Sequence, residues 1–566
     1  MLSKKQTWSL LISILILAAF LRLYNLTSAD VITDEALIAF RAIGYIDFFV
    51  SPYQTTPYEW FSDTPAWVKL SFHDHPPLIF LIENLFFKVF GVNVFSLRLP
   101  FVLAGMASVI LIYLIGSQLF NQKSGLLAAL FLAISPYHLW ISRVGLQESM
   151  VMALMLLAFY FFILSLGNQK HWRWGIFLGL AMLSKYTAII LLPIFLVYLL
   201  ISNRKILFDK KFWLAIILVI LIFSPVLIYN FKLYQARGHF DLQLSFLFGQ
   251  KVNEWQFLPG KIQAGSLFDR IINLIPAMFR GLLAPMFLLF AISLLSVVYQ
   301  LIKETLQLAP SWQSGGARSE PLIAPPLVVL AIIFHILLFM LIGPLSRFVV
   351  MIIPFSLLLI VWFLPQLPKK IMMTLVILIT FSEIFFSYNT LYAFTPIGQK
   401  DFTYAYFRND SVNWGYNQLD DYLTEIFKNK RPAVSFTGRY PFLEKIKQQA
   451  TATAKKENKQ PATILLIYDE NMYDLATLWL FHRRLIYEGW PIITADAYLG
   501  QSQDYWRRQG ITEFYFVKII DPAILQRPEA ERSQAAQNLS EQLNSSPKSI
   551  IKRLDSRSVF AVYYWQ

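Results

Sequence analysis

Long apolar runs separated by short polar connections fill roughly the first 390 residues of the chain. A run must hold roughly 20 residues to cross a bilayer. Candidate runs of this kind lie at 8–24, 98–119, 125–141, 149–166, 212–231, 277–302, 322–343, 348–364 and 371–391. The longer run 174–202 is interrupted by Ser184, Lys185 and Tyr186, and a lysine at mid-bilayer is costly. We therefore expect two shorter spans that meet at Lys185, which gives about eleven spans in all.

The run 77–90 is too short to cross the bilayer untilted. If it does not cross, the basic clusters near Lys123, Arg204 and Lys369 fall on the same side as Lys4 and Lys5. This arrangement satisfies the positive-inside rule better than its inverse. The run 77–90 is therefore predicted to be a juxtamembrane or re-entrant helix, and 1–24 an uncleaved first helix that starts in the cytoplasm.

This topology puts most polar residues that can do chemistry on one face. The loops 25–97 and 232–276 and the tail from about residue 395 are predicted to lie outside the membrane, at the plasma membrane if the source is a prokaryote. The segment 311–318 is predicted to be a flexible cytoplasmic linker.

The tail 395–566 has a different pattern. Short apolar runs at 433–436, 463–468, 514–519 and 559–564 are typical of strands, and charged helical stretches alternate with them. We expect two domains: a polytopic helical membrane domain over 1–394, with 25–97 as its first outer loop, and a soluble extracytoplasmic α/β domain over 395–566.

The composition supports a membrane protein and excludes several classes of function. The chain is 56% hydrophobic and 15% charged, whereas a soluble protein carries about 25% charged residues. Its net charge of +14 is spread over loop clusters and the tail, which argues against a nucleic-acid partner. The absence of cysteine excludes disulfides, thiolate metal sites and cysteine nucleophiles.

Two polar groups lie in the first outer loop. Asp34 and Glu35 form an adjacent carboxylate pair that can act as a general base or bind a divalent metal. The alternative is a helix start, with Thr33 as the cap and both acids facing the positive end of the helix dipole. His73, Asp74 and His75 offer two imidazoles and a carboxylate, which is metal-ligand chemistry; the alternative is a polar turn before Pro76.

Three basic residues fall on the same predicted outer face. Arg143 stands there, with Glu148 close by, although the positive-inside rule does not account for it. Lys185 at the helix break and Arg347 after it have chemistry suited to an anion. Together the three predict a basic pocket for a lipid phosphate. For Lys185 the alternative is a structural ion pair with Glu83, Glu148 or Glu383.

In this order the motifs resemble the GT-C membrane glycosyltransferases, in the branch of protein O-mannosyltransferases and bacterial aminoarabinose transferases. The matching features are the acidic pair, the His-Pro-Pro-Leu motif from His75 to Leu78, the segment Leu97-Arg98-Leu99-Pro100, the run 125–136, Ser142-Arg143 with Glu148, the helix break at Lys185, and Arg347-Phe348 with Pro354. Ser184-Lys185-Tyr186 stands in place of the commoner Thr-Lys-Gly.

The resemblance implies a polyprenyl-phosphate sugar donor and an acceptor of unknown type. It implies that Asp34 acts as the base or orients the acceptor, that Glu35 supports it, and that Arg143, Lys185 and Arg347 hold the donor phosphate. His73 and His75 would bind a divalent metal or contact the phosphate directly, with Asp74 and Glu148 as neighbouring acids. Two other functions stay open at this point: a transporter or flippase of lipid-linked saccharides, and a non-catalytic scaffold.

Overall fold

The computed structural model describes residues 3–49, 54–256, 265–308, 324–436, 438–525 and 532–566. The predicted linker 311–318 lies outside these residues. The chain forms two compact units. The first contains Met1–Leu26, Leu70–Ile82 and Arg98–Arg408, and the second contains Thr27–Lys69, Glu83–Leu97 and Asn409–Gln566.

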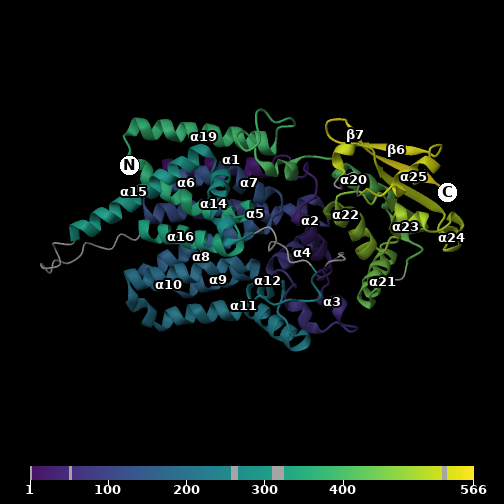
Figure 1. Ribbon diagram of the computed structural model, residues 1–566, viewed down its shortest axis with the longest axis horizontal. Helices are drawn as coiled ribbons and strands as arrows, with labels where there is room; N and C mark the ends of the chain where they lie inside the picture. Colours follow the sequence, from purple (N-terminus) through teal and green to yellow (C-terminus); the bar gives the residue numbers. More distant parts are fainter. Residues whose placement is uncertain (1–2, 50–53, 257–264, 309–323, 437, 526–531) are drawn as a thin grey trace. The chain divides into compact units, whose positions relative to one another are not determined.

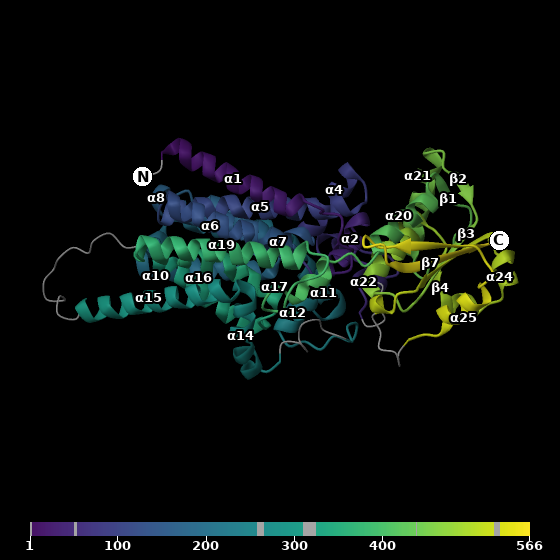
Figure 2. The same ribbon diagram turned by 90° about the horizontal axis from the view of Figure 1, so that it is seen from above.

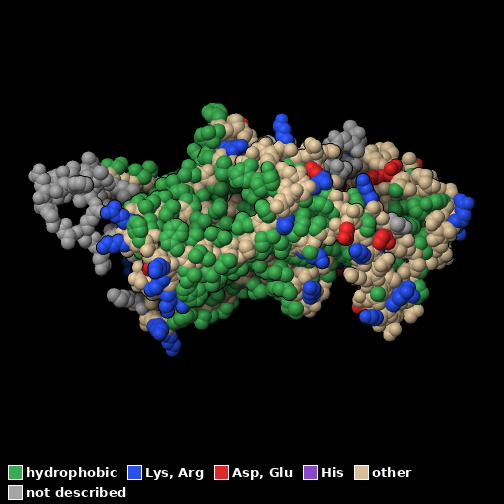
Figure 3. All heavy atoms as spheres, turned by 90° about the horizontal axis from the view of Figure 1, so that it is seen from below, with side chains coloured by type: hydrophobic (Ala, Val, Ile, Leu, Met, Phe, Trp, Pro, Cys, Tyr) green, Lys and Arg blue, Asp and Glu red, His purple; other side chains and the backbone are tan. Residues whose placement is uncertain are grey.

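The first unit is a bundle of long apolar helices (Figures 1 and 2). Six described helical segments have the length and hydropathy to cross a membrane, or eight if two bent pairs each count as one span. The six are α1 (Lys4–Leu23), α5 (Val94–Leu119), α8 (Gln147–Asn168), α11 (Lys210–Arg237), the segment Arg347–Gln366 that contains α18 (Ile353–Phe363), and α19 (Lys369–Leu391). The predicted helical membrane fold is therefore confirmed, but among the described residues the count is six to eight spans and not the predicted eleven. Hydrophobic side chains cover much of its surface, and Lys and Arg gather at one end of the bundle (Figure 3).

Several predicted spans are broken in the structure. The run 125–141 divides into α6 (Gln122–Ile134) and α7 (Pro136–Arg143), with a bend of 59° at Ser135. The run 174–202 forms α9 (Trp172–Ser184), the short helix η2 (Tyr186–Ile190) and α10 (Leu191–Ser202), and it breaks at Lys185 as predicted.

The run 277–302, predicted as a span, is broken in the structure. It divides between α14 (Leu267–Leu282) and α15 (Ala284–Leu308), which are bent by 117° at Leu283. Leu283 adopts a φ of 59°, which a continuing right-handed helix cannot contain. The apolar part of another helix, α16 (Ala324–Ile342), is too short for this helix to be counted among the six spans.

Close packing between α9 and α11 depends on two glycines one helical turn apart. A Cβ atom placed on Gly175 would lie 2.4 Å from the carbonyl oxygen of Ala215, and one on Gly179 would lie 2.9 Å from Ile222. Without a hydrophobic driving force between helices in lipid, such small-residue contacts let the backbones approach and gain dispersion energy. The glycine pair therefore fixes the helix that leads to Lys185.

The second unit is built on a mixed sheet of five strands in the order β4-β3-β5-β7-β6. Strands β3 (Ile464–Tyr468), β4 (Ile492–Thr494) and β5 (Glu513–Ile519) run parallel, whereas β7 (Ser558–Trp565) pairs antiparallel with β5 and with β6 (Lys548–Lys552). Strand β3 is buried throughout because helices cover both faces of the sheet. Helices α20 (Tyr416–Phe427) and α22 (Asp474–Thr477) cover one face, and α23 (Ala495–Leu499), α24 (Gln503–Arg508) and α25 (Ala535–Gln542) cover the other.

Three of the four predicted strands lie in this sheet, and the predicted strand 433–436 is wrong. The chain pairs slightly earlier, as β1 (Lys430–Pro432) beside β2 (Gln460–Ala462). The N–H of Ala433 donates a last bond to Ala462, where β2 ends, so the pairing stops there.

Gly175→Ala is predicted to destabilise the protein, because the added methyl group meets backbone atoms of Ala215 rather than a movable side chain. The expected cost is about 1–3 kcal/mol, the usual range for overpacking. The matched control is Gly167→Ala in α8, where a Cβ meets nothing within 4 Å and the better helix propensity of alanine adds stability. Thermal unfolding of both variants in detergent checks this, and equal melting temperatures for the two would contradict it.

Candidate active site

The acidic pair opens helix α2 (Asp34–Gly44) in the second unit. Thr33 is the N-cap, and its side-chain oxygen accepts a bond from the N–H of Glu35 at 3.4 Å. The helix-start alternative is therefore present in the structure, and it is compatible with a chemical role. Asp34 is half-buried and Glu35 is fully buried.

The C-terminal domain holds the start of α2 in place. The Asp30 carboxylate accepts bonds from the backbone N–H groups of Trp414 and Asn417, the latter at 2.8 Å. The side-chain amide of Asn417 donates to the carbonyls of Thr27 and Ala29 at 2.9 and 2.7 Å. Because these bonds involve the backbone just before Asp34, the position of the acidic pair depends on the C-terminal domain.

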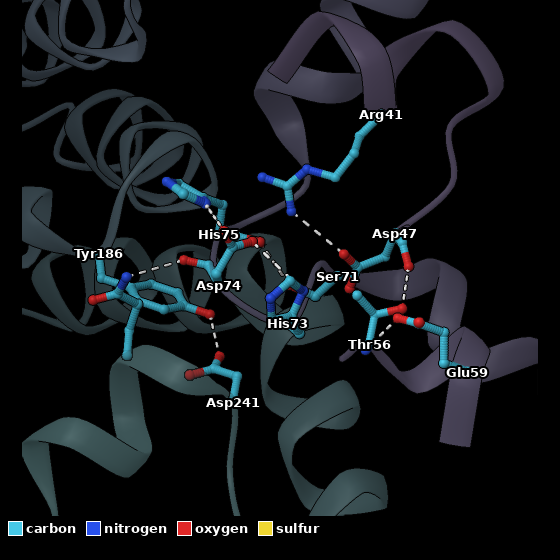
Figure 4. Close-up of polar contacts among 11 residues, drawn as sticks. Arg41, Asp47, Thr56, Glu59, Ser71, His73, Asp74, His75, Tyr186 and Asp241 are labelled. Carbon is cyan, nitrogen blue, oxygen red and sulfur yellow. Dashed lines mark hydrogen bonds and ion pairs between the residues drawn. The ribbon is translucent and has the colours of Figure 1, made fainter. Parts of the chain in front are cut away.

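The far end of α2 is fixed in the same unit. Tyr487 donates to the carbonyl of Phe40 at 2.7 Å. Arg41 pairs with Asp47 at 3.3 Å, and both side chains are buried (Figure 4). The helix therefore has little freedom to move against the domain.

Glu83 on α4 (Leu78–Phe90) is a second buried carboxyl of this unit. It is 1% exposed, and neither of its carboxyl oxygens has a hydrogen-bond partner among the described residues. Burial, and then the charge of Glu35, raise the pKa of Glu83 well above its usual range. Sequence reasoning considered Glu83 only as an ion-pair partner for Lys185. Its location in an apolar helix was the signal for an uncharged carboxyl.

The first unit contains the histidine motif. Asp74 lies between the two imidazoles, with Oδ2 at 2.9 Å from Nδ1 of His75 and Oδ1 at 3.8 Å from Nδ1 of His73 (Figure 4). His73 and Asp74 are buried and His75 is partly exposed. The first turn of α12 (Leu242–Leu247) holds this turn in place, because the N–H of Leu242 donates to the carbonyl of His73 at 2.7 Å and the side-chain amide of Gln243 donates to the carbonyl of Asp74 at 3.2 Å.

Lys185 lies in the same unit at the break between α9 and η2. Its backbone is extended, with φ −162° and ψ 135°, so the helix stops and the side chain is released from the helical pattern. Its ammonium group is 2.5 Å from Glu148 Oε1, and both side chains are buried. The ion pair with Glu148, one of the alternatives predicted for Lys185, is present.

Lys185 and Arg347 contact one aromatic ring. The Nζ atom of Lys185 is 4.7 Å from the ring centroid of Phe348, and the guanidinium carbon of Arg347 is 5.3 Å from the same centroid. The structure thus brings together two of the three cations predicted for the phosphate, although they lie far apart in the sequence. Two cationic side chains at one ring offer donors of the kind that bind an anion such as phosphate.

Arg143 has a different environment. One terminal nitrogen of its guanidinium donates to the carbonyls of Leu21, Arg22 and Tyr24 at 2.8–3.0 Å, and the other donates to Asn25 at 3.3 Å. These carbonyls belong to the C-terminal end of α1, where a cation is favourable. Arg143 therefore ties α7 to α1, and its role toward phosphate stays a prediction.

A hydrogen-bonded group beside Lys185 was missed by sequence reasoning. Tyr186 donates to the buried Asp241 at 2.5 Å, and the amide of Asn230 donates to the same carboxylate at 2.9 Å. Burial raises the pKa of Asp241, and hydrogen bonds from Leu244, Tyr186 and Asn230 oppose that effect. Because Asp241 precedes the segment that clamps His73 and Asp74, this group links the lysine break to the histidine motif (Figure 4). The sequence signal for this group was Tyr186, which stands where the family motif commonly has glycine.

Comparisons with known proteins agree with this architecture. Residues 74–229 match the family described as dolichyl-phosphate-mannose-protein mannosyltransferase. Two Bacillus subtilis (strain 168) proteins that bear mannosyltransferase names are similar: YycA is 30% identical over 217 residues and YkcB is 25% identical over 205. The matches cover 37% and 35% of this chain but only 30% and 27% of those proteins.

The fold has a full-length counterpart among solved structures. ArnT from Cupriavidus metallidurans, in a crystal structure with undecaprenyl phosphate, superposes with a TM-score of 0.52 at 12% identity, over 99% of this chain and 98% of that one. The fold and the matched segment confirm the predicted resemblance to the GT-C membrane glycosyltransferases. The matched segment contains Asp74, His75, Arg143, Glu148 and Lys185, whereas Asp34, Glu35, His73 and Arg347 lie outside it.

The substitution Glu83→Gln is predicted to remove a pH-dependent loss of folding stability. The folded pKa of Glu83 is raised above its ordinary value of 4.5, so only the unfolded state ionises as the pH first rises above that value. Wild-type stability therefore falls with rising pH, by up to about 1.4 kcal/mol per pH unit, until the folded carboxyl ionises. Glu83→Gln should gain melting temperature over wild type at pH 7 and lose that advantage near pH 4.

The control for this test is Glu425→Gln, which changes an exposed glutamate of the same unit. Its melting temperature should follow that of wild type at both pH values. The prediction fails if the difference between Glu83→Gln and wild type is the same at pH 4 and pH 7.

Proposed function

We propose that this protein transfers a sugar from a polyprenyl-phosphate donor to an acceptor at the outer face of the membrane. The observation that carries the proposal is the shared contact of Lys185 and Arg347 with Phe348, next to Glu148, at a break between two apolar helices. A pair of cations at that break suits a phosphate whose lipid tail lies in the bilayer. The match of 74–229 to a lipid-phosphate mannosyltransferase family supports the same donor class.

Lys185 and Arg347 would bind the donor phosphate and stabilise it as a leaving group. When the bond between the anomeric carbon and the phosphate oxygen breaks, negative charge grows on the phosphate. Cations fixed beforehand in a low-dielectric site stabilise that charge more than the ground state. An ammonium group has three donors, so its contact with Glu148 does not prevent a contact with phosphate.

Asp34 would act as the general base. It would accept the proton of the acceptor hydroxyl as that oxygen attacks the anomeric carbon from the face opposite the phosphate, with inversion of configuration. The products are the glycosylated acceptor and the free polyprenyl phosphate, so atoms and charge balance. Glu35, which is buried behind Asp34 at the helix start, would orient it. Arg143 would act indirectly, by fixing α7 against the end of α1.

The histidine motif would hold a divalent metal. The chemistry of its donors fits such an ion, since Asp74 stands between the imidazoles of His73 and His75 and two of the three side chains are buried. A metal bound there would add positive charge near phosphate oxygens. The Tyr186–Asp241 group would keep the motif in register with the lysine break.

The proposed orientation follows from charge. The N-terminus and the basic end of the bundle would face the cytoplasm, and the C-terminal domain would lie outside, because basic clusters are retained inside. The chain is an integral membrane protein, and a nucleic-acid partner is not part of the proposal.

Mass spectrometry of products tests the proposal directly. The purified chain in lipid is incubated with a panel of polyprenyl-phosphate sugars and candidate acceptors. The expected result is a covalent product heavier than the acceptor by one sugar residue, together with free polyprenyl phosphate. Movement of intact donor across vesicles without any covalent product would instead support a flippase.

Asp34→Asn is predicted to lower the turnover number by about 10²–10⁴-fold, the usual contribution of a general base. Donor binding should change little, because the proposed phosphate site does not include Asp34. The matched control is Asp63→Asn, an exposed aspartate of the same outer segment, which should keep wild-type turnover. Full activity of Asp34→Asn in a correctly folded protein would remove it as the base.

A further inference from the structure

Helix α14 presents an exposed apolar face that the predicted topology leaves in water. Its large apolar side chains are exposed by 53–69%; they are Leu267, Phe268, Ile271, Ile272 and Ile275. Their spacing puts them on one side of the helix, since residues three and four apart share a face. Asp269, Asn273 and Arg280 lie on the opposite side by the same spacing.

The contacts of Arg270 set the depth of this helix. Its guanidinium donates to the carbonyls of Met340 and Leu341 at 2.9 and 2.7 Å, at the C-terminal end of the apolar helix α16. If α16 crosses the bilayer, its end lies at a bilayer surface, because a helix of 19 residues is about as long as the hydrocarbon core is thick. The N-terminal half of α14 therefore lies at the membrane interface.

The bend between α14 and α15 sets the direction of α14. If α15 crosses the bilayer, the bend of 117° puts α14 much closer to the membrane plane than to its normal, and Figure 2 shows it turned away from the line of α15. The C-terminal half packs into the bundle through Ala277, Met278 and Leu282. One end of α14 is thus fixed against the bundle, while the apolar face of its N-terminal half stays exposed.

We propose that α14 is an interfacial amphipathic helix whose apolar face is inserted into the outer phospholipid leaflet. An apolar stripe of this kind with a polar opposite face is the signature of helices that lie in the membrane plane. The capping box of Ser266 and Asp269 satisfies the first turn, so the helix does not need a protein partner at its N-terminus. This assignment is independent of the reaction proposed above.

Spin labelling tests the assignment cleanly, because the chain has no cysteine. Ile272→Cys and its neighbour Asn273→Cys are each labelled with a nitroxide in the full-length protein, in vesicles of phosphatidylethanolamine and phosphatidylglycerol. Collision with oxygen, which concentrates in lipid, is compared with collision with a water-soluble nickel chelate. The expected ratio of oxygen to nickel collisions is several-fold higher at position 272 than at 273, and Phe268→Cys should behave like Ile272→Cys.

Two results would overturn the assignment. Equal access of nickel to positions 272 and 273 would put the face in water. Broadening of the 272 spectrum that disappears on dilution with unlabelled protein would mean that a second copy of the chain covers the face.

Discussion

The buried ion pair between Lys185 and Glu148 is the interaction on which the rest of the membrane unit depends. An unpaired charge in a low-dielectric interior costs several kcal/mol, and removing one partner of such a pair typically costs about 3–5 kcal/mol. In α8, Glu148 supplies an acid at 2.5 Å from the lysine, and Phe348 supplies a ring face. The pair thus constrains α8, α9 and the segment at Arg347 together. Lys185 and Arg347 are thereby held at one aromatic ring inside this unit.

The acidic pair has a different kind of support. Its helix α2 is held at the start by Asp30 and Asn417 and at the end by Tyr487, so the soluble part of the chain acts as its scaffold. Two adjacent carboxylates can act in catalysis only when their positions and protonation states are fixed. Burial and the charge of Glu35 raise the pKa of Glu83, which favours the uncharged form of this carboxyl.

Much of the fold follows from local pattern in the sequence. Apolar runs predict the membrane helices because lipid leaves the backbone few alternatives, and the charged Lys185 correctly predicts the break in 174–202. Strands β3, β5 and β7 are visible as short apolar runs between turns. The bend at Leu283 was missed, because hydropathy measures how apolar a segment is and not its direction.

The candidate site is less predictable, because local sequence patterns do not show which distant residues meet in space. Residue types and order suggested Asp34, His73, His75, Lys185 and Arg347, but their roles stay predictions. The contact of Lys185 with Phe348 and the Tyr186–Asp241 bond join residues distant in the chain, and no local pattern contains them. The packing of α2 on the C-terminal domain is equally long-range, which is why sequence placed them in separate domains.

The central claim is that Lys185 and Arg347 form the site for the donor phosphate. A density map of the protein with a bound polyprenyl phosphate tests it most directly. The account predicts phosphate density within hydrogen-bond distance of Lys185 Nζ and the Arg347 guanidinium, with the prenyl chain leading into the bilayer. Phosphate density at another place, with no ligand density beside Lys185 and Arg347, would contradict it.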